Sequence, residues 1–363
     1  MLSPHPIPAA LTGEQRFLNA CWQKPVDCTP VWFMRQAGRY MPEYRAVRAQ
    51  HTLLEICRHP ELAAEVTLQP VRRFGVDAAI LFADILLPLI PMGIELEFAA
   101  GEGPVIRNPI REPADIDALR PVEPREELAF VLEAVRMLRR ELAGKTALIG
   151  FAGGPFTLAS YLIEGGSSRN YQRTKQLMYS RPEAWNQLME KLAGLASRYL
   201  VAQIEAGAQA VQLFDSWTGA LAPDDYREFV LPHSRKIFTE LRKTGAPAIH
   251  FGTDTGLLLP LLREAGGDVI GIDWKTPLDW GWSSLEHRTA VQGNLDPAAL
   301  LAPPGVLERK VMRILHQAGG RPGHIFNLGH GVLPETPPEN VARVVELVHS
   351  GAGSPPGSES GRI

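Results

Sequence analysis

The stretch RPEAWNQLMEKLAGLASRYLVAQIEAGAQAVQLFD, residues 181–215, contains the pattern that decides the fold. In its first part, apolar side chains recur at alternating spacings of three and four residues, as on one face of an amphipathic helix: Trp185, Leu188, Leu192, Leu195 and Tyr199. The pattern stops at Gly207, and glycine often follows the last turn of a helix. The apolar run AVQLFD then predicts a buried strand, so the stretch predicts a helix that covers a parallel sheet.

Seven more apolar runs of this kind recur along the chain, separated by helix-patterned segments: PVWFM (30–34), AAILFA (78–83), ALIGFAG (147–153), PAIHFG (247–252), VIGID (269–273), TAVQGN (289–294) and HIFNLG (324–329). The segment APDDYREFVLPHSRKIFTELRKTG, residues 222–245, is one of the predicted helices. About eight strands alternating with helices predict an α/β fold of the (β/α)8 TIM barrel type. The alternative is an open doubly wound sheet, but no GxGxxG opens a first helix and no Walker loop occurs.

The domain organisation follows from the remaining segments. The segment GIELEFAAGEGPVIRNPI, residues 93–110, alternates around a glycine turn and predicts a β-hairpin insertion after the second strand. No interior linker is present, so we expect residues 11–350 to form a single domain. Residues 351–363, GAGSPPGSESGRI, are expected to form a flexible C-terminal tail because they are rich in Gly, Ser and Pro.

Composition excludes several classes of protein. The 363 residues are 45% hydrophobic and 21% charged, as in globular proteins, and the net charge is −3. The basic footprint of a nucleic-acid-binding protein is therefore missing. The most membrane-like run, residues 78–94, contains Asp84, Pro88 and Pro91, so we interpret it as a strand and a loop.

The cysteines and the N-terminus predict a cytoplasmic protein. Cys21, Cys28 and Cys57 form no CxxC spacing, and an odd number of cysteines is typical of reduced thiols. The N-terminus has neither a basic segment nor a continuous apolar segment of the kind found in signal peptides. No HExxH motif and no set of His and Asp at ligand spacing occurs, so we expect no zinc or iron site.

Functional residues are expected where strands end, because the active site of a TIM barrel lies at the carboxyl ends of its strands. The polar or glycine-rich segments at these ends, in chain order, are Arg35–Arg39, Asp84, Gly153–Pro155, Asp215–Trp217, Thr253–Asp254, Asp273–Trp274, Asn294–Asp296 and Gly329–Gly331.

Arg35 and Arg39 are four residues apart, so on a helical turn both guanidinium groups would face the same way. Arginine binds carboxylate or phosphate with two parallel hydrogen bonds, which lysine cannot do. The plain alternative is a solvated helix start. Gly38 interrupts such a helix and the pair directly follows a strand, which favours anion binding.

Asp84 is a single carboxylate in a strongly apolar stretch. An unpaired buried carboxylate is unfavourable, so Asp84 must cap a helix, pair with a cation or accept a functional hydrogen bond. In an apolar setting its charge would stabilise a developing cation by roughly 4 kcal/mol at about 4 Å, for an effective dielectric constant near 20.

Other candidates carry plainer alternatives. His330 lies between two glycines, where a ligand can approach closely, although it could be an ordinary loop histidine. Ser216 could be a helix N-cap, and Tyr161 a core aromatic residue. Lys275 could form a Schiff base, but the polar setting DWKTP favours a solvated lysine.

Several of these stretches together resemble the uroporphyrinogen decarboxylase family in order and spacing, from about residue 15 to residue 350: PVWFMRQAGRYMPEYR, LFADI, GFAGGPFTLASYLIEGGSS, LFDSW, VQGNLDP and FNLGHGV. The resemblance implies a (β/α)8 barrel and a homodimer. It implies an enzyme that converts the four acetate side chains of uroporphyrinogen III to methyl groups, giving coproporphyrinogen III in haem and tetrapyrrole biosynthesis. It implies a tetrapyrrole as the substrate and no metal or organic cofactor.

The resemblance also implies roles for individual residues. Asp84 and Arg35 match the catalytic positions, and the expected substrate-binding residues are Arg35, Gln36, Ala37, Gly38, Arg39, Asp84, Tyr161, Ser216 and His330. In the mechanism expected from the sequence, the pyrrole is protonated at the carbon bearing the acetate, and ionised Asp84 stabilises the resulting cation while CO₂ leaves. Arg35 is a candidate proton source, although a guanidinium is a poor donor.

One departure from the family and two other functions remain open. Many relatives carry a lysine in the loop after the fifth strand, where this chain has Thr253–Asp254, so a carboxylate contact there is in doubt. Corrinoid-linked methyltransferases of the same fold hold zinc through His and Cys, but all three cysteines here precede residue 58. A non-catalytic tetrapyrrole-binding protein would keep the arginines without an ionised Asp84. Elements that could contact a partner subunit are the hairpin at 93–110, Trp280 and Trp282.

Overall fold

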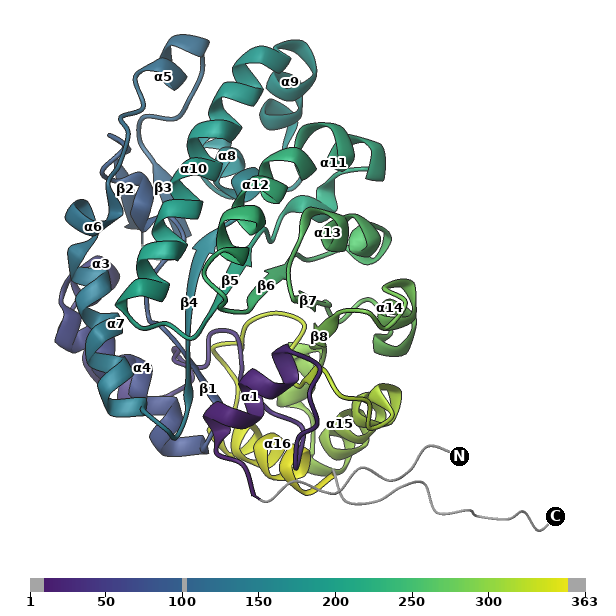
Figure 1. Ribbon diagram of the computed structural model, residues 1–363. Coiled ribbons are helices and arrows are strands. Elements are labelled where there is room, and N and C mark those ends of the chain that lie inside the picture. Colours follow the sequence, from purple (N-terminus) through teal and green to yellow (C-terminus); the bar gives the residue numbers. More distant parts are fainter. Residues whose placement is uncertain (1–9, 100–102, 352–363) are drawn as a thin grey trace.

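The computed structural model describes residues 10–99 and 103–351, which form a curled parallel sheet with helices on its outside (Figure 1). The seven strands of the sheet lie in chain order: β1 (Ala78–Ile80), β4 (Ala147–Gly153), β5 (Ala210–Phe214), β6 (Ala248–Phe251), β7 (Val269–Gly271), β8 (Ala290–Gln292) and β9 (His324–Ile325). Every pair of neighbouring strands is parallel. Each crossover therefore moves one strand along in the same direction, which curls the sheet and places all carboxyl ends on one side.

The unit that decides the fold is confirmed. Helix α10 (Pro182–Ala206) buries the five apolar residues predicted to form its inner face and ends at Gly207, which has a φ of 124°. Strand β5 follows it, and all seven residues of the neighbouring β4 are buried. An almost continuous apolar strand is what a sheet covered on both faces requires.

The helices that connect successive strands of the sheet include α7 (Ala129–Leu142), α8 (Pro155–Glu164), α12 (Leu231–Arg242), α13 (Leu259–Ala265), α14 (Leu278–Ser284) and α15 (Pro304–Ala318). Helix α4 (Pro60–Phe74) precedes β1, and α16 (Pro338–Ser350) follows β9. Shorter helices lie beside them: α1 (Gly13–Cys21), α2 (Pro42–Arg48), α3 (Leu53–Arg58), α5 (Pro113–Asp117), α6 (Pro124–Glu127), α9 (Gln172–Ser180) and α11 (Pro223–Phe229). The single helix predicted over residues 222–245 is instead divided into α11 and α12 at Val230. Pro232 explains the division, because proline favours the first turn of a helix and disrupts its interior.

The strand predicted at residues 30–34 does not form as a regular strand. Val31 makes an isolated parallel bridge to Phe326, and the Phe326 N–H donates to the carbonyl of Pro30 at 2.8 Å. On the other side, the Asp77 N–H donates to the Val31 carbonyl at 2.9 Å, while the Val31 N–H donates to Asp77 Oδ2 at 2.7 Å. A side chain thus takes the place of a backbone acceptor, so no ladder continues. The segment nevertheless lies between β9 and β1 and bonds to residues next to both.

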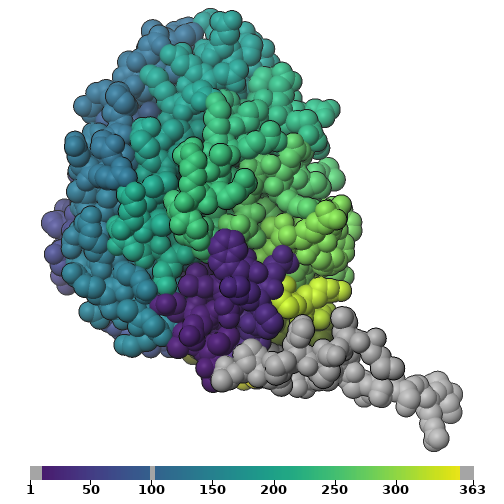
Figure 2. Space-filling model, viewed as in Figure 1, coloured from purple at the N-terminus to yellow at the C-terminus, as the bar shows by residue number. Residues whose placement is uncertain are grey.

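The two ends of the described chain lie side by side. Helix α1 packs against β9 and β8, and Figure 2 shows the N-terminal segment in purple beside the yellow C-terminal segment. Residues 352–363, most of the expected tail, lie outside the described residues. Among those that are described, no helix is both long and apolar enough to cross a membrane.

Strands β2 (Leu96–Ala99) and β3 (Gly103–Ile106) pair antiparallel within the segment predicted to form a hairpin. The residues between them, 100–102, lie outside the described part of the chain. The Ile106 N–H donates to the Gly165 carbonyl just after α8 at 2.8 Å, so this pair of strands is attached to the main body beside that helix.

Candidate active site

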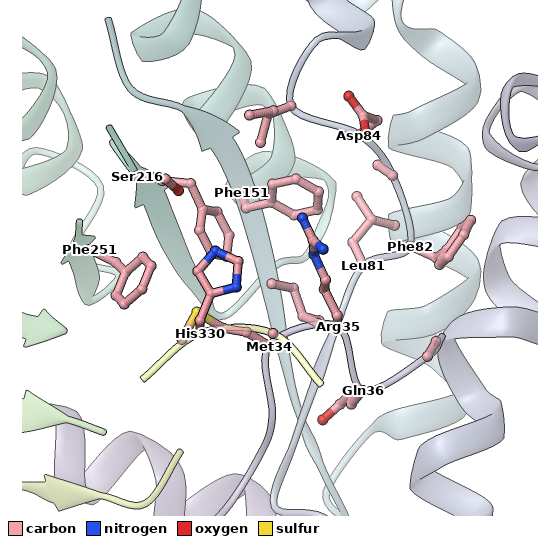
Figure 3. A pocket seen from close by; sticks show the side chains of 16 residues that line it. Met34, Arg35, Gln36, Leu81, Phe82, Asp84, Phe151, Ser216, Phe251 and His330 are labelled. Atoms are coloured by element: carbon pink, nitrogen blue, oxygen red, sulfur yellow. The ribbon is translucent and has the colours of Figure 1, made fainter. Parts of the chain in front are cut away.

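A pocket of about 200 Å³ opens at the carboxyl ends of the strands (Figure 3). Its wall is mostly apolar, with aromatic side chains from the ends of several strands, and only a few side chains are polar. The lining residues are Met34, Arg35, Gln36, Ala37, Ile80, Leu81, Phe82, Ala83, Asp84, Ile85, Phe151, Phe214, Ser216, Phe251, His330 and Gly331. Binding pockets for small molecules commonly combine an apolar wall with a few placed polar groups.

Arg35 lines the pocket, whereas Arg39 does not. The helical turn predicted to carry both is wrong, because Arg35 has a φ of 59° and helix α2 begins only at Pro42. Both arginines have exposed side chains. The two guanidinium groups are therefore presented by an irregular loop, with Arg35 inside the pocket and Arg39 outside its lining.

The loop from Arg35 to Gly38 is held in place by Gln36, whose side chain is buried. Gln36 Nε2 donates to the Ala78 carbonyl at 3.2 Å, and Gln36 Oε1 accepts from the Phe33 N–H at 3.1 Å. The Tyr40 hydroxyl donates to the Gln36 carbonyl at 2.6 Å. The Gln36 side chain is thus occupied within the protein. Ala37 lines the pocket, and Gly38 lies outside its lining.

Asp84 lies on the pocket wall in the segment that follows β1. Its Oδ1 accepts a hydrogen bond from the Leu86 N–H at 2.8 Å, so Asp84 does begin the turn before the short 3-10 helix η1 (Leu87–Leu89). Within residues 10–99 and 103–351, its Oδ2 takes part in no hydrogen bond. One carboxylate oxygen is therefore used for folding, and the other is available to a ligand.

Two opposing influences act on the protonation of Asp84. Burial raises the pKa of this carboxyl group, while the Leu86 N–H and the positive charge of Arg35 lower it. In Figure 3 the guanidinium of Arg35 extends on the side of the pocket where Asp84 lies. The arginine thus favours the charged form of a carboxylate that burial disfavours.

His330 and Ser216 lie on the pocket wall in the loops that follow β9 and β5. Burial, and then the charge of Arg35, lower the pKa of His330 to about 4, so its imidazole is neutral at pH 7. The ring of Trp274 meets the His330 ring edge-on, with 6.2 Å between centroids. Ser216 caps no described helix; its carbonyl accepts from the Thr253 N–H at 3.2 Å.

Tyr161, on α8, is not part of the pocket lining. Its ring lies 4.0 Å from the ring of Trp217, measured between centroids, and Trp217 in turn lies 5.2 Å from Tyr171. Burial and the nearby charge of Asp84 both raise the pKa of the Tyr161 hydroxyl. The structure therefore places Tyr161 within electrostatic range of Asp84 but beside the pocket, in an aromatic group.

Sequence reasoning missed several lining residues. The phenylalanines at positions 82, 151, 214 and 251 form much of the apolar wall, and each lies within or next to a predicted strand. The sequence does show an aromatic residue near each of these strand ends, but an aromatic residue buried in the core gives the same pattern. Gly331, which lies in the strand-end segment predicted at Gly329–Gly331, also lines the pocket, and a Cβ at this position would lie 2.4 Å from Arg35 Cδ.

Lys275 lies outside the pocket lining and forms an ion pair with Asp254. Its ammonium also lies over the Trp274 ring, 5.4 Å from the centroid. The hydrogen bond to Asp254 raises the pKa of Lys275, which favours the charged ammonium over a nucleophilic amine. The Schiff-base alternative therefore has no support in this geometry.

The three cysteines, Cys21, Cys28 and Cys57, are buried, unpaired and absent from the pocket lining. Within the described ranges, no group of three or more His, Cys, Asp or Glu side chains is placed to hold a metal ion.

A pocket at the carboxyl ends of a curled parallel sheet is where barrel enzymes of the α/β class carry out their chemistry. With an arginine, a carboxylate and a neutral imidazole on an apolar wall, the fold and site define a TIM-barrel-like enzyme of this class. A solved structure agrees on the fold: a methyltransferase from Methanosarcina mazei has a TM-score of 0.79 over 94% of this chain and 99% of its own, at 19% identity.

Sequence comparison identifies the family. The family model described as Uroporphyrinogen decarboxylase (URO-D) matches residues 12–351. A uroporphyrinogen decarboxylase of Sorangium cellulosum is 63% identical over 337 residues, covering 93% of this chain and 96% of the relative. One of Carboxydothermus hydrogenoformans is 59% identical over 333 residues, covering 92% and 95%. The chain belongs to the uroporphyrinogen decarboxylase family, a family of carboxy-lyases.

Proposed function

We propose that this protein decarboxylates the four acetate side chains of uroporphyrinogen III to methyl groups and releases coproporphyrinogen III, in haem and tetrapyrrole biosynthesis. The observation that carries the proposal is Asp84: in a chain of this family, it presents one unbonded carboxylate oxygen in an apolar pocket beside Arg35. The reaction needs no metal or organic cofactor in this proposal, because the pyrrole ring itself accepts electrons once it is protonated.

The chemistry decides which ring carbon receives the proton. Protonation at the carbon bearing the acetate, as the sequence hypothesis had it, would leave the acetate methylene on a saturated carbon. Protonation at the neighbouring ring carbon instead conjugates that methylene with the cationic ring. The electron pair of the breaking C–C bond then forms an exocyclic double bond and neutralises the ring as CO₂ leaves. A proton added to the exocyclic methylene gives the methyl group, and loss of the first proton restores the pyrrole.

Asp84 is assigned the stabilisation of that cation. Its free oxygen can accept hydrogen bonds from pyrrole N–H groups, and its negative charge lies in an apolar wall where water screens it poorly. Arg35 supports this role by favouring the ionised carboxylate. The source of the proton is a separate question, for which the guanidinium of Arg35 is a candidate, although a guanidinium is a poor proton donor.

The carboxylate side chains of the substrate are assigned to the edge of the pocket. Arg35 and Arg39, with the backbone of Gln36, Ala37 and Gly38 between them, would bind carboxylates. The neutral imidazole of His330 and the hydroxyl of Ser216 would donate or accept hydrogen bonds on the opposite wall. Tyr161 lies outside the pocket lining, so its hydroxyl would meet only the part of the ligand that extends beyond that lining.

The test is direct. The purified protein is incubated with uroporphyrinogen III without oxygen or light, and the products are oxidised and separated by their number of carboxylates. We expect species with seven, six, five and four carboxylates to appear with release of CO₂, unchanged by a metal chelator. Retention of the substrate without CO₂ release would instead assign the protein to the tetrapyrrole-binding class, and activity lost on chelation would contradict a cofactor-free reaction.

The finer architecture is also part of the proposal. The hydrogen bonds of Val31 to Asp77 and of Pro30 to Phe326 support counting this segment as a barrel strand, which completes a (β/α)8 barrel. The β2–β3 pair would then be an insertion after the second barrel strand, within a single domain over residues 11–350. The unpaired cysteines support a cytoplasmic location. Trp280, half exposed, supports a homodimer contact, whereas Trp282 is 1% exposed and is excluded from that role.

A further inference from the structure

Asp215 is a fully buried carboxylate directly before Ser216, and the pocket does not include it. Its Oδ1 accepts two hydrogen bonds from one residue of α8: the Thr157 N–H donates at 2.9 Å and the Thr157 hydroxyl at 2.8 Å. Its Oδ2 has no partner among the described residues. An ionisable group buried in this way requires an explanation, because an unpaired carboxylate is unfavourable in the interior.

The beginning of α8 supplies the first part of the explanation. The N-cap residue of this helix is Gly154, which has no side chain to accept from the first free N–H groups. Asp215, from the loop after the neighbouring strand, accepts from the third helical residue instead. A Cβ at Gly154 would lie 2.4 Å from both Cβ and Cγ of Asp215, so glycine is required for the carboxylate to reach this position.

The same contacts extend across Ser216. The Trp217 N–H donates to the Thr157 hydroxyl at 3.1 Å, and the Thr218 hydroxyl donates to the Asp215 carbonyl at 2.9 Å. Ser216 is therefore held between two residues that both bond to Thr157. Thr157 lies one helical turn before Tyr161, whose ring packs on Trp217.

We infer that Asp215 is a positioning residue: by capping α8 from the neighbouring strand loop, it fixes Ser216 and Tyr161 relative to each other at the edge of the pocket. The inference rests on the proposed function, since that function assigns both residues to the substrate. The Asp215 side chain is absent from the pocket lining and acts through Thr157.

The electrostatics agree with a cap. Burial raises the pKa of Asp215 to about 6, while the hydrogen bonds from Thr157, and then the nearby N–H of Phe156, lower it. The carboxylate is thus largely ionised at pH 7 despite its burial, and a negative charge at a helix N-terminus is favourable.

The experiment compares steady-state kinetics on uroporphyrinogen III for the full-length protein, four variants and one control variant. Asp215→Ala removes the cap of α8, that is, both hydrogen bonds that Asp215 accepts from Thr157. Asp215→Asn keeps the shape and a neutral acceptor. Thr157→Val removes the hydroxyl and its hydrogen bonds to Asp215 and Trp217 but keeps the backbone N–H that Asp215 caps, and Thr157→Ser retains the hydroxyl. Asp268→Asn is the matched control, because Asp268 Oδ2 also accepts a backbone N–H, from Ala248 at 2.9 Å, but lies before β7 at the amino ends of the strands.

We expect Asp215→Ala and Thr157→Val to raise KM by about ten-fold or more with kcat changed by less than about three-fold, because Asp84 and Arg35 lie on other loops. Asp215→Asn should lie in between, Thr157→Ser should restore the wild-type KM, and Asp268→Asn should leave KM unchanged. If Asp215→Ala does not fold, Asp215→Asn and Thr157→Val decide, together with amide hydrogen exchange, which should be faster at Thr157 in Asp215→Asn.

Two outcomes overturn the inference: a folded Asp215→Ala or Thr157→Val variant with the wild-type KM, or the same rise in KM for Asp268→Asn. Failure of the proposed function is distinguishable from both, because the wild-type protein itself would then not turn over.

Discussion

The side chain of Arg35 packs against the backbone of Gly331, so closely that a Cβ at position 331 would lie 2.4 Å from Arg35 Cδ. The Val332 N–H donates to the Met34 carbonyl at 2.9 Å, which fixes the two loops against each other. Glycine at this position therefore determines where the guanidinium of Arg35 lies in the pocket.

The first prediction concerns that contact. Gly331→Ala should displace Arg35 and raise KM for uroporphyrinogen by about ten-fold, since a misplaced binding group loses much of its effect. Gly305→Ala is the control: it lies within α15, where the nearest atom to an added Cβ is 3.8 Å away. Steady-state kinetics on both variants check the prediction, and an unchanged KM for Gly331→Ala would contradict it.

Arg35→Lys should retain the positive charge but lose the two parallel hydrogen bonds that a guanidinium offers to a carboxylate. We expect kcat/KM to fall about 100-fold, equivalent to roughly 3 kcal/mol. Arg72→Lys on the exposed face of α4 is the matched control. Comparable kinetics for Arg35→Lys and the wild type would show that charge alone suffices.

Asp84→Asn tests the central carboxylate. The amide oxygen can still accept from the Leu86 N–H, so the thermal midpoint should change little. Loss of roughly 4 kcal/mol of cation stabilisation should lower kcat about 1000-fold. Asp296→Asn is a close control, because Asp296 Oδ1 accepts from the N–H two residues later at 2.9 Å, as Asp84 does, outside the active-site pocket. Near-normal turnover by Asp84→Asn would remove the role assigned to this residue.

His330 should make stability depend on pH. Its pKa is about 4 in the folded protein and about 6.5 in an unfolded chain, so between these values the unfolded state binds more protons and stability falls as pH falls. From pH 7 to pH 5 this residue should account for a loss of about 2 kcal/mol. Between pH 7 and pH 5, the free energy of unfolding measured in urea should fall by correspondingly less in His330→Asn than in the wild type. The control is His316→Asn, at an exposed position, and its free energy of unfolding should fall by as much as that of the wild type. The idea fails if the His330 variant and the wild type lose the same amount.

Asp215 should make stability depend on pH in the opposite direction. Its pKa is raised to about 6, above the usual value of an aspartate, so the folded state binds more protons and stability falls as pH rises from about 4 to about 6. Asp215→Asn should remove a change of about 2 kcal/mol over this range. The measurement is the free energy of unfolding of both proteins at pH 4.5, 5.5 and 6.5; parallel curves would show that this carboxyl group does not titrate as stated.

Much of the fold follows from local pattern. The helix and strand within residues 181–215 were predictable because the apolar period changes from that of a helix to that of a buried strand at Gly207. The irregular pairing of residues 30–34, where a strand was expected, could not be predicted, because the acceptor for the Val31 N–H is the side chain of Asp77. A tertiary hydrogen bond of this kind leaves no periodic signal.

The site divides in the same way. Asp84, Ser216 and His330 lie at strand ends, where the barrel rule places functional residues, and all three line the pocket. The orientation of Arg35 and Arg39 could not be predicted from their spacing, because the left-handed backbone at Arg35 breaks the helical geometry that the spacing assumes. The apolar wall of phenylalanines was also hidden, because a composition pattern does not distinguish a core aromatic from a lining one.

The pairing of Val31 with Phe326 has a consequence for how the chain folds while the ribosome synthesises it. A nascent chain exposes residue 31 early, but its partner leaves the ribosome only when almost the entire polypeptide has been made. Until then, the side of the Val31 segment that faces away from β1 and the last strand of the growing sheet have free backbone groups that can bond to another molecule. Prematurely terminated chains that lack residue 326 should therefore aggregate rather than accumulate as smaller folded units.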